Sequence, residues 1–299
     1  MKPSPRLQSA LALAAAALTL LTPKAGAQGE KPSATKSGFV TSADGARIHY
    51  IDAGKGPAIL FVPGWTMPGW IWEKQITQFA MTHRVVAMDP RAQGESSQTA
   101  EGLYPAARAR DIKAVTEQLK LAPVVLVGWS MGAIELAAYV DQYGTDTLAG
   151  LVFVDGWAGR DFDPNTLPTM FQWVPGFQKG RRQWTEDFLH SSYMFKKPQP
   201  EGYLERLREA MLKTPTNSAM AIWLGYITSD FRPALARIDK PTLIIAAEGG
   251  LCGSACEDMH KRIRGSQLQV IENVGHALFV EEPERFNSLL EDFVSGLAH

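Results

Sequence analysis

Cysteine is scarce in this sequence. Only Cys252 and Cys256 occur among 299 residues, which is too few for a scaffold held together by disulfides. Two cysteines without a nearby pair of histidines also make a weak zinc site, so we expect no metal. In an oxidising compartment the two thiols can pair with each other, and the alternative is two free buried thiols.

An excess of charge of either sign is lacking as well. The chain has 30 Lys and Arg residues against 31 Asp and Glu residues, and its formal net charge is −1 at pH 7. Domains that bind nucleic acid present basic patches or stripes. We therefore expect no nucleic-acid partner.

Long hydrophobic runs are missing beyond the N-terminus. The one such run, residues 7–21, follows Lys2 and Arg6 and precedes a small-residue site ending at Ala27, which is the pattern of a secretory signal peptide. The run is shorter than the roughly 20 apolar residues that span a bilayer. We expect residues 1–27 to be cleaved and the mature chain to be exported, to the periplasm or out of the cell, without stable membrane insertion. An uncleaved anchor is the alternative.

What the sequence does contain is a series of short apolar runs bounded by Gly, Pro and Asp. Runs of this length without polar alternation are typical of strands buried on both faces of a parallel sheet. Helical patterns lie between several of them, such as the spacing of Ile112, Val115 and Leu119. The alternation predicts an α/β fold with a mostly parallel central sheet flanked by helices. The apolar runs span residues 58–64, 84–90, 124–130, 151–156, 242–248 and 268–276.

Two further segments depart from this alternation. Residues 38–54 alternate apolar and polar side chains around an Asp-Gly turn, which predicts an antiparallel hairpin at the edge of the sheet. From residue 157 to 238 the strand pattern stops, and short helical stretches rich in Trp, Phe, Met and Pro follow. We predict that 157–238 forms a helical cap over the site, inserted into a core made of 28–156 and 239–299.

The sequence Gly128-Trp129-Ser130-Met131-Gly132 lies between a predicted strand and a predicted helix. A serine in this context sits on a tight turn that exposes its hydroxyl at the end of the strand, an arrangement called a nucleophile elbow. The flanking glycines are needed because a β-carbon there would collide with the neighbouring strand or helix. The backbone N–H of Met131 begins the helix and faces the place where an oxyanion would form. An ordinary turn serine is the alternative interpretation.

With this elbow the chain resembles the α/β-hydrolase superfamily, as a serine esterase with a helical cap, over essentially the whole mature sequence. The stretch FVPGWTMPGW is similar to the family's loop after the third strand, with Trp65 in the position of the second oxyanion donor and Pro63 where histidine is usual. The stretch MDPRAQGESS is similar to the loop after the fourth strand, with Gly94 and Ser96 in their usual places. The stretch ENVGHALFVEEPERF resembles the histidine loop and nominates His276. The resemblance implies no cofactor.

A histidine is required because an aliphatic hydroxyl is a poor nucleophile at neutral pH unless a neighbouring base removes its proton. Imidazole titrates in the range needed for that step and can afterwards protonate the leaving group. The resemblance therefore implies Ser130 as the nucleophile and His276 as its general base.

The acid that orients the histidine is missing from its usual place. The superfamily commonly carries it shortly after the strand at 242–248, and Gly250 occupies that position. Some members carry the acid instead after the strand that follows the elbow helix, where this chain has Asp155. A carboxylate there can accept the ring N–H and favour the imidazolium that develops during attack. We favour Asp155, and Glu248 and Asp258 are the alternatives.

These residues predict a secreted serine hydrolase that cleaves a small carboxylic ester through an acyl-enzyme on Ser130, with Trp65 and Met131 as oxyanion donors. Trp65 and Trp129 flank the predicted chemistry, so we expect an apolar substrate pocket lined by Trp129 and, from the predicted cap, Trp157. The alternative is that most apolar side chains of the cap only pack the core of the insertion. The predicted cap offers further apolar side chains: Met170, Phe171, Trp173, Trp223 and Tyr226.

Other activities would use the same residues. Hydrolysis of a lactone, an amide or a carbon–carbon bond, and cofactor-free perhydrolase or haloperoxidase activity, all share the predicted triad. Haloalkane dehalogenation and epoxide opening are disfavoured, because by resemblance those enzymes use an aspartate where this chain has Ser130. A catalytically inactive protein that binds a small molecule is the non-enzymatic alternative.

Overall fold

The computed structural model describes residues 35–161, 168 and 171–297. The predicted signal peptide at 1–27 lies outside this part of the chain, as does Met170 of the predicted cap. Within the described residues, none of the helices combines the length and apolar character that crossing a bilayer requires.

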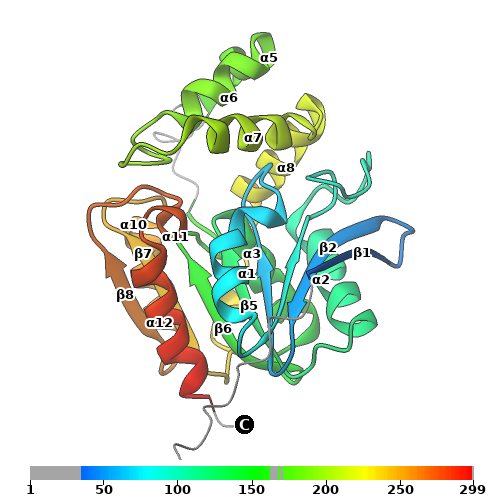
Figure 1. Ribbon diagram of the computed structural model, residues 1–299, viewed down its shortest axis with the longest axis vertical. Coiled ribbons are helices and arrows are strands. Elements are labelled where there is room, and N and C mark those ends of the chain that lie inside the picture. The colour runs from blue at the N-terminus through cyan, green and yellow to red at the C-terminus, as the bar shows by residue number, and fades with distance from the viewer. Residues whose placement is uncertain (1–34, 162–167, 169–170, 298–299) are drawn as a thin grey trace, which may run out of the picture. The chain divides into compact units, whose positions relative to one another are not determined.

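A mostly parallel sheet of eight strands forms the centre of the described residues (Figure 1). The strands follow the spatial order β1-β2-β4-β3-β5-β6-β7-β8. Strand β1 pairs with β2, and β2 with β4, in antiparallel register, so the predicted hairpin lies at the edge of the sheet. All other pairs are parallel, and the predicted α/β architecture is confirmed. The strands are β1 (Lys36–Thr41), β2 (Arg47–Gly54), β3 (Ala58–Val62), β4 (Arg84–Met88), β5 (Val124–Trp129), β6 (Leu148–Val154), β7 (Thr242–Ala247) and β8 (Gln267–Ile271).

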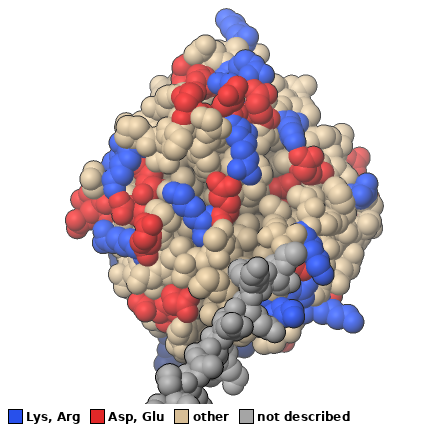
Figure 2. Space-filling model, in the orientation of Figure 1, with Lys and Arg blue, Asp and Glu red and all other residues tan. Residues whose placement is uncertain are grey.

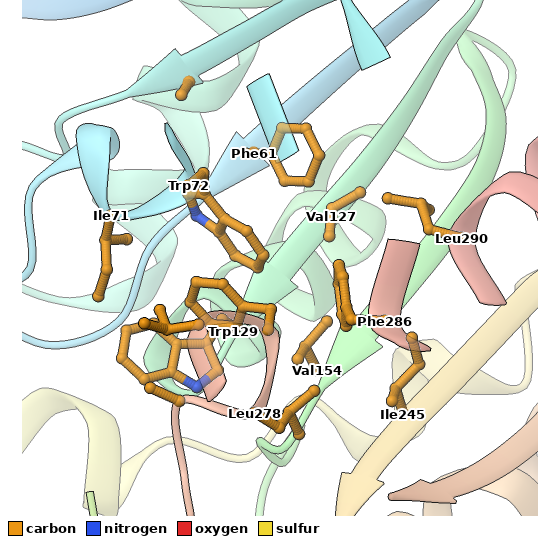
Figure 3. Packing of buried hydrophobic residues seen from close by; sticks show 14 of the residues in the cluster. Phe61, Ile71, Trp72, Val127, Trp129, Val154, Ile245, Leu278, Phe286 and Leu290 are labelled. Carbon is orange, nitrogen blue, oxygen red and sulfur yellow. The ribbon is translucent and has the colours of Figure 1, made fainter. Parts of the chain in front are cut away.

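Helices cover both faces of the sheet because the strands bury apolar side chains on both. Successive residues of a strand point to opposite faces. In β3, Ile59 and Phe61 join one buried cluster, whereas Leu60 and Val62 join the other. The first cluster includes side chains of α1, α11 and α12, of which Figure 3 shows Leu278 of α11 and Phe286 and Leu290 of α12. The second cluster includes side chains of α2, α3 and α10. These helices are α1 (Glu73–Phe79), α2 (Pro105–Gln118), α3 (Met131–Tyr143), α10 (Gly253–Arg262), α11 (Leu278–Glu281) and α12 (Pro283–Ser295).

Between β6 and β7, the described residues form helices and no strand. Helices α5, α6 and α7 lie above the carboxyl ends of the parallel strands (Figure 1). Helix α7 buries Leu204, Leu207 and Met211, which are spaced three and four residues apart and therefore share one face. The helices of this stretch are α5 (Val174–Lys179), α6 (Arg181–Leu189), α7 (Glu201–Leu212), α8 (Thr216–Thr228) and α9 (Arg232–Leu235).

Charged side chains of both signs are interspersed over the face shown in Figure 2. Some of them pair between α6 and α7, where Arg208 contacts Glu186 and Arg182 lies 2.5 Å from Glu209. Exposed pairs of this kind contribute about 0–1 kcal/mol each. These pairs therefore add little to the stability of the contact between α6 and α7.

Candidate active site

Ser130 lies between the end of β5 and the start of α3, as the elbow pattern predicts. Its backbone has φ 57° and ψ −116°, a conformation that is strained for a residue with a β-carbon. The Ser130 N–H donates to the Val154 carbonyl at 2.8 Å, which anchors the turn to β6. A β-carbon on Gly132 would lie 2.5 Å from the Val62 carbonyl oxygen, so only glycine allows α3 to start this close to β3.

His276 lies in the loop between β8 and α11, and both of its backbone polar groups are bonded. Its N–H donates to the Tyr193 carbonyl at 2.7 Å, and its carbonyl accepts from Trp129 Nε1 at 2.9 Å. The imidazole is packed between the Trp129 and Tyr193 rings, with centroid distances of 4.9 Å and 5.2 Å. Contacts from both the elbow and the helical insertion therefore fix the ring.

Asp155 is the acid that the structure brings to this histidine. It follows β6, is fully buried, and its Oδ2 lies 2.6 Å from His276 Nδ1. The two alternative acids are elsewhere: Glu248 is exposed, and Asp258 pairs with Arg262 at 2.7 Å.

The loop after β7 supplies no acid of its own, and its backbone N–H groups bind the Asp155 carboxylate instead. Leu251 N–H donates to Oδ2 at 3.1 Å, and Cys252 N–H lies 3.4 Å from Oδ1. A β-carbon on Gly250 would lie 2.6 Å from Oδ1, so the Asp155 carboxylate already fills the space that a side chain at 250 would need. A disulfide between Cys252 and Cys256 closes this loop at the start of α10.

The two predicted oxyanion donors lie beside the serine. Met131 is the first residue of α3, and N–H groups of a first helical turn have no partner within the helix. Trp65 follows Gly64, and the loop runs so close that a β-carbon on Gly64 would lie 3.0 Å from the Ser130 β-carbon. The backbone of both donors therefore borders the Ser130 hydroxyl.

A cavity of about 720 Å³ opens onto Ser130 and His276. Its volume lies within the range of small-molecule sites. Trp, Phe and Tyr supply half of the lining residues, which are Trp65, Met67, Trp129, Ser130, Gln172, Trp173, Trp184, Asp187, Phe188, Ser191, Tyr193, Trp223, Leu251 and His276.

Only one of the two predicted pocket residues lines the cavity. Trp129 lines the cavity, but Trp157 does not. The Trp157 ring is buried and stacks on Tyr226 of α8 at a centroid distance of 4.5 Å, so it packs inside a hydrophobic cluster instead of lining the cavity. Of the predicted cap residues, Trp173 and Trp223 line the cavity.

Sequence reasoning missed Trp184 and Phe188, which also line the cavity. They lie four residues apart on α6, and their rings stack at 5.2 Å. That spacing places them on one helix face, and it is the feature of the sequence that could have predicted an aromatic surface there.

Within the described ranges, one side-chain cluster has the spacing of a metal site. Glu186, His190 and Glu201 bring ligand atoms within 4.8 Å of one another on α6 and α7. All three are at least partly exposed, and Glu186 is already paired with Arg208. The serine chemistry does not use this cluster.

Comparison with known proteins places the chain in a family. The model of the alpha/beta hydrolase fold matches residues 57–283. A non-heme haloperoxidase from Rhodococcus erythropolis is 28% identical over 274 residues, which cover 86% of this chain and 99% of that protein. A bifunctional esterase/perhydrolase from Acinetobacter calcoaceticus is 32% identical over 228 residues, covering 71% of this chain and 81% of the relative.

A solved structure agrees with these matches. An esterase from Exiguobacterium antarcticum superposes with a TM-score of 0.80 at 25% identity, covering 86% of this chain and 99% of that one. The chain belongs to the α/β-hydrolase family.

Proposed function

We propose that this protein is a serine hydrolase that cleaves carboxylic esters through an acyl-enzyme on Ser130. One observation carries the proposal: His276 Nδ1 lies 2.6 Å from the buried Asp155 carboxylate, in a ring that lines the same cavity as Ser130. A carboxylate in that position keeps the imidazole in the tautomer that can accept a proton at Nε2. The esterases among the relatives and solved structures support the same reaction class.

The first half of the reaction acylates the serine. Ser130 Oγ attacks the ester carbonyl carbon while its proton passes to His276 Nε2, and Asp155 stabilises the resulting imidazolium. The N–H groups of Trp65 and Met131 stabilise the oxyanion. The bond to the alkoxy oxygen then breaks, and His276 Nε2 protonates the departing alcohol.

The second half releases the acid. His276 takes a proton from water, and the oxygen of that water attacks the acyl carbon on Ser130. The bond to Ser130 Oγ breaks, His276 returns the proton to the serine, and the carboxylic acid leaves. The residues return to their starting state.

The chemistry of the cavity wall favours an uncharged, apolar ester. Aromatic rings supply half of the lining residues, Lys and Arg are absent among the described residues that line the cavity, and the carboxylate of Asp187 would repel an anion. A substrate carboxylate or phosphate would therefore lose its hydration without gaining a cationic partner. Esters of apolar acids and alcohols avoid that loss.

Perhydrolase activity is a second candidate, because two of the matched relatives are a haloperoxidase and an esterase/perhydrolase. Hydrogen peroxide in place of water would attack the same acyl-enzyme and release a peracid. Peracid formation from acetate and peroxide, measured beside ester turnover, distinguishes the two activities.

We also propose that the protein works outside the cytoplasm. The N-terminal pattern is that of a signal peptide, and the Cys252–Cys256 disulfide supports an oxidising compartment. Cell fractionation with N-terminal sequencing of the mature chain tests this: a mature protein beginning near residue 28 is expected, and an intact N-terminus in the cytoplasm would refute export.

The ester-hydrolase proposal is tested by labelling and turnover together. Wild type should react with a fluorophosphonate probe and hydrolyse p-nitrophenyl esters, and Ser130→Ala should lose both. Folded wild-type protein that neither reacts with the probe nor hydrolyses the esters would refute the proposal.

A further inference from the structure

A buried glutamine spans the loop that carries the Trp65 oxyanion donor. Gln93 lies after β4 and is fully buried. Its Nε2 donates to the Gly64 carbonyl at 2.9 Å and to the Met67 carbonyl at 2.8 Å. The loop also closes on itself, since Met67 N–H donates to the Gly64 carbonyl at 3.2 Å. One amide group therefore ties together both ends of the loop.

The Gly64 contact has a direct consequence for Trp65. The Gly64 carbonyl and the Trp65 N–H belong to the same peptide unit, which is planar and trans, so the two groups point in opposite directions. A hydrogen bond that fixes the carbonyl also fixes the N–H. Gln93 therefore sets the direction of one oxyanion donor without touching the substrate.

A buried arginine fixes the orientation of this glutamine and also contacts the Met131 side chain. Arg108 of α2 donates from Nη2 to Gln93 Oε1 at 2.8 Å, and its Nη1 lies 3.5 Å from Met131 Sδ. Its Nε lies 3.0 Å from a carboxylate oxygen of Glu135, one turn after Met131 on α3. Arg108 is 1% exposed, so these contacts are shielded from water. Because Oε1 accepts from arginine, Nε2 of Gln93 is the end that faces the two carbonyls.

We propose that Gln93 is a positioning residue that holds the Trp65 backbone donor of the oxyanion hole in a fixed direction, and that Arg108 holds Gln93 in the orientation this requires. This inference rests on the proposed ester-hydrolase function. Preorganised donors stabilise a developing oxyanion because they need no reorientation during the reaction. Loosening the Gly64 peptide unit should therefore slow the chemical step and change substrate binding little.

The main test compares two buried glutamines. Gln93→Met removes the amide and keeps a side chain of similar size. Gln75→Met is the matched control, because Gln75 is equally buried but donates to the Phe279 carbonyl, at 3.0 Å, and not to this loop. We expect Gln93→Met to lower kcat about 10- to 100-fold, less than the loss of a whole donor, with KM changed less than about threefold. Gln75→Met should keep kcat within about threefold of wild type.

A second variant distinguishes the effect of the Gln93 hydrogen bonds from the effect of side-chain size. Gln93→Glu keeps the size of the side chain and its contact to Arg108, but its carboxylate cannot donate to the two carbonyls. It should lower kcat at least as much as Gln93→Met. A Gln93→Glu enzyme with wild-type kcat would overturn the proposal.

Backbone hydrogen exchange provides a readout that does not need activity. Peptides covering residues 62–68 should exchange about tenfold faster in Gln93→Met than in wild type, and should be unchanged in Gln75→Met. Equal exchange in these peptides in all three proteins would overturn the positioning role, even if wild type proves inactive on esters. Inactive wild type with faster exchange in Gln93→Met would instead refute the ester-hydrolase function and leave the loop contact supported.

Discussion

Asp155 connects two parts of the chain that are distant in sequence. Its Oδ2 bonds the His276 ring at 2.6 Å, and the same oxygen accepts from Leu251 N–H at 3.1 Å. These contacts fix the direction of the carboxylate toward Nδ1. The geometry accounts for a hydrolase that has glycine where its family commonly has the acid.

Replacing Asp155 by asparagine should be severe. The amide cannot enforce the tautomer in which Nε2 accepts the serine proton, so kcat should fall about 10⁴-fold. Glu248→Gln is the matched control, because Glu248 is exposed, and it should stay within about threefold of wild type. Steady-state kinetics on one p-nitrophenyl ester measures both variants. A larger loss in Glu248→Gln than in Asp155→Asn would transfer the acid role to Glu248.

Glu135 predicts a pH dependence of stability. Burial raises its pKa to about 7 from the usual 4.5, while the nearby Arg108 opposes the shift and Asp111 adds to it. Between these two values the folded state holds a proton that the unfolded chain has released. The resulting stability is fully present below about pH 4.5 and is lost as the pH rises through about 7.

The pH dependence can be isolated with Glu135→Gln, which keeps the neutral form at every pH. From pH 5 to pH 8, wild type should lose stability relative to this variant, measured as the free energy of unfolding in urea. The same difference between the two proteins at both pH values would contradict the raised pKa.

At the scale of elements, the loop between β7 and α10 replaces a catalytic side chain with backbone donors. Leu251 and Cys252 direct their N–H groups at Asp155, and the Cys252–Cys256 disulfide closes the loop next to them. A short covalent ring restricts the conformations open to this segment. The disulfide therefore supports the loop whose N–H groups bind the Asp155 carboxylate.

Opening the disulfide should lower activity moderately. Cys252→Ser with Cys256→Ser should reduce kcat several-fold, because a weakened hydrogen bond to Asp155 is worth about 1 kcal/mol. Dithiothreitol should have a similar effect on wild type and none on the double variant. Unchanged kcat in both the reduced wild type and the double variant would show that the loop holds Asp155 without the disulfide.

The sequence predicts elements well where burial is two-sided. Each apolar run contains a strand, and every residue of β3, β5 and β7 is buried, because a segment covered on both faces must be apolar throughout. Strand β8 differs: it lies at the edge of the sheet, and Val270 is exposed. The last run, 268–276, ends as a strand at Ile271, since Asn273 adopts φ 58° and turns the chain toward His276. No pattern in the sequence predicts the turn at Asn273, whereas the apolar run predicts the strand.

At the scale of the described molecule, the core and the helical insertion share the cavity wall. Trp65, from the loop after β3, donates from Nε1 to the Ala219 carbonyl of α8 at 2.8 Å. Its ring also packs near Trp173 and Trp223 of the insertion, at 5.5 Å and 5.6 Å. Trp65 therefore has two roles in this account: its backbone N–H is the proposed oxyanion donor, and its side chain binds the insertion.

Trp65→Phe should separate these two roles. The backbone N–H stays, so kcat should change less than about threefold, while loss of the bond to Ala219 should raise KM several-fold. Trp157→Phe is the control, because Trp157 Nε1 has no hydrogen-bond partner within the described residues and its ring lies outside the cavity. Equal KM values for the two variants would contradict this role of the indole.

Long-range packing sets the limit of what the sequence could reveal. Ser130, His276, Trp65 and Met131 are recognisable because each lies in a local motif. The fate of Trp157 depends on its stacking with Tyr226, which is 69 residues away, and no local pattern encodes that contact. The link from Arg108 to Gln93 likewise joins separate elements, so only the folded structure reveals it.

The central claim is that Ser130 carries the acyl group, and intact-protein mass spectrometry tests it most directly. Wild type quenched with acid during turnover of p-nitrophenyl butyrate should gain the mass of one butyryl group, and peptide mapping should place it on Ser130. The adduct should be absent from Ser130→Ala. Undiminished turnover by Ser130→Ala, or an acyl group on another residue, would contradict the account.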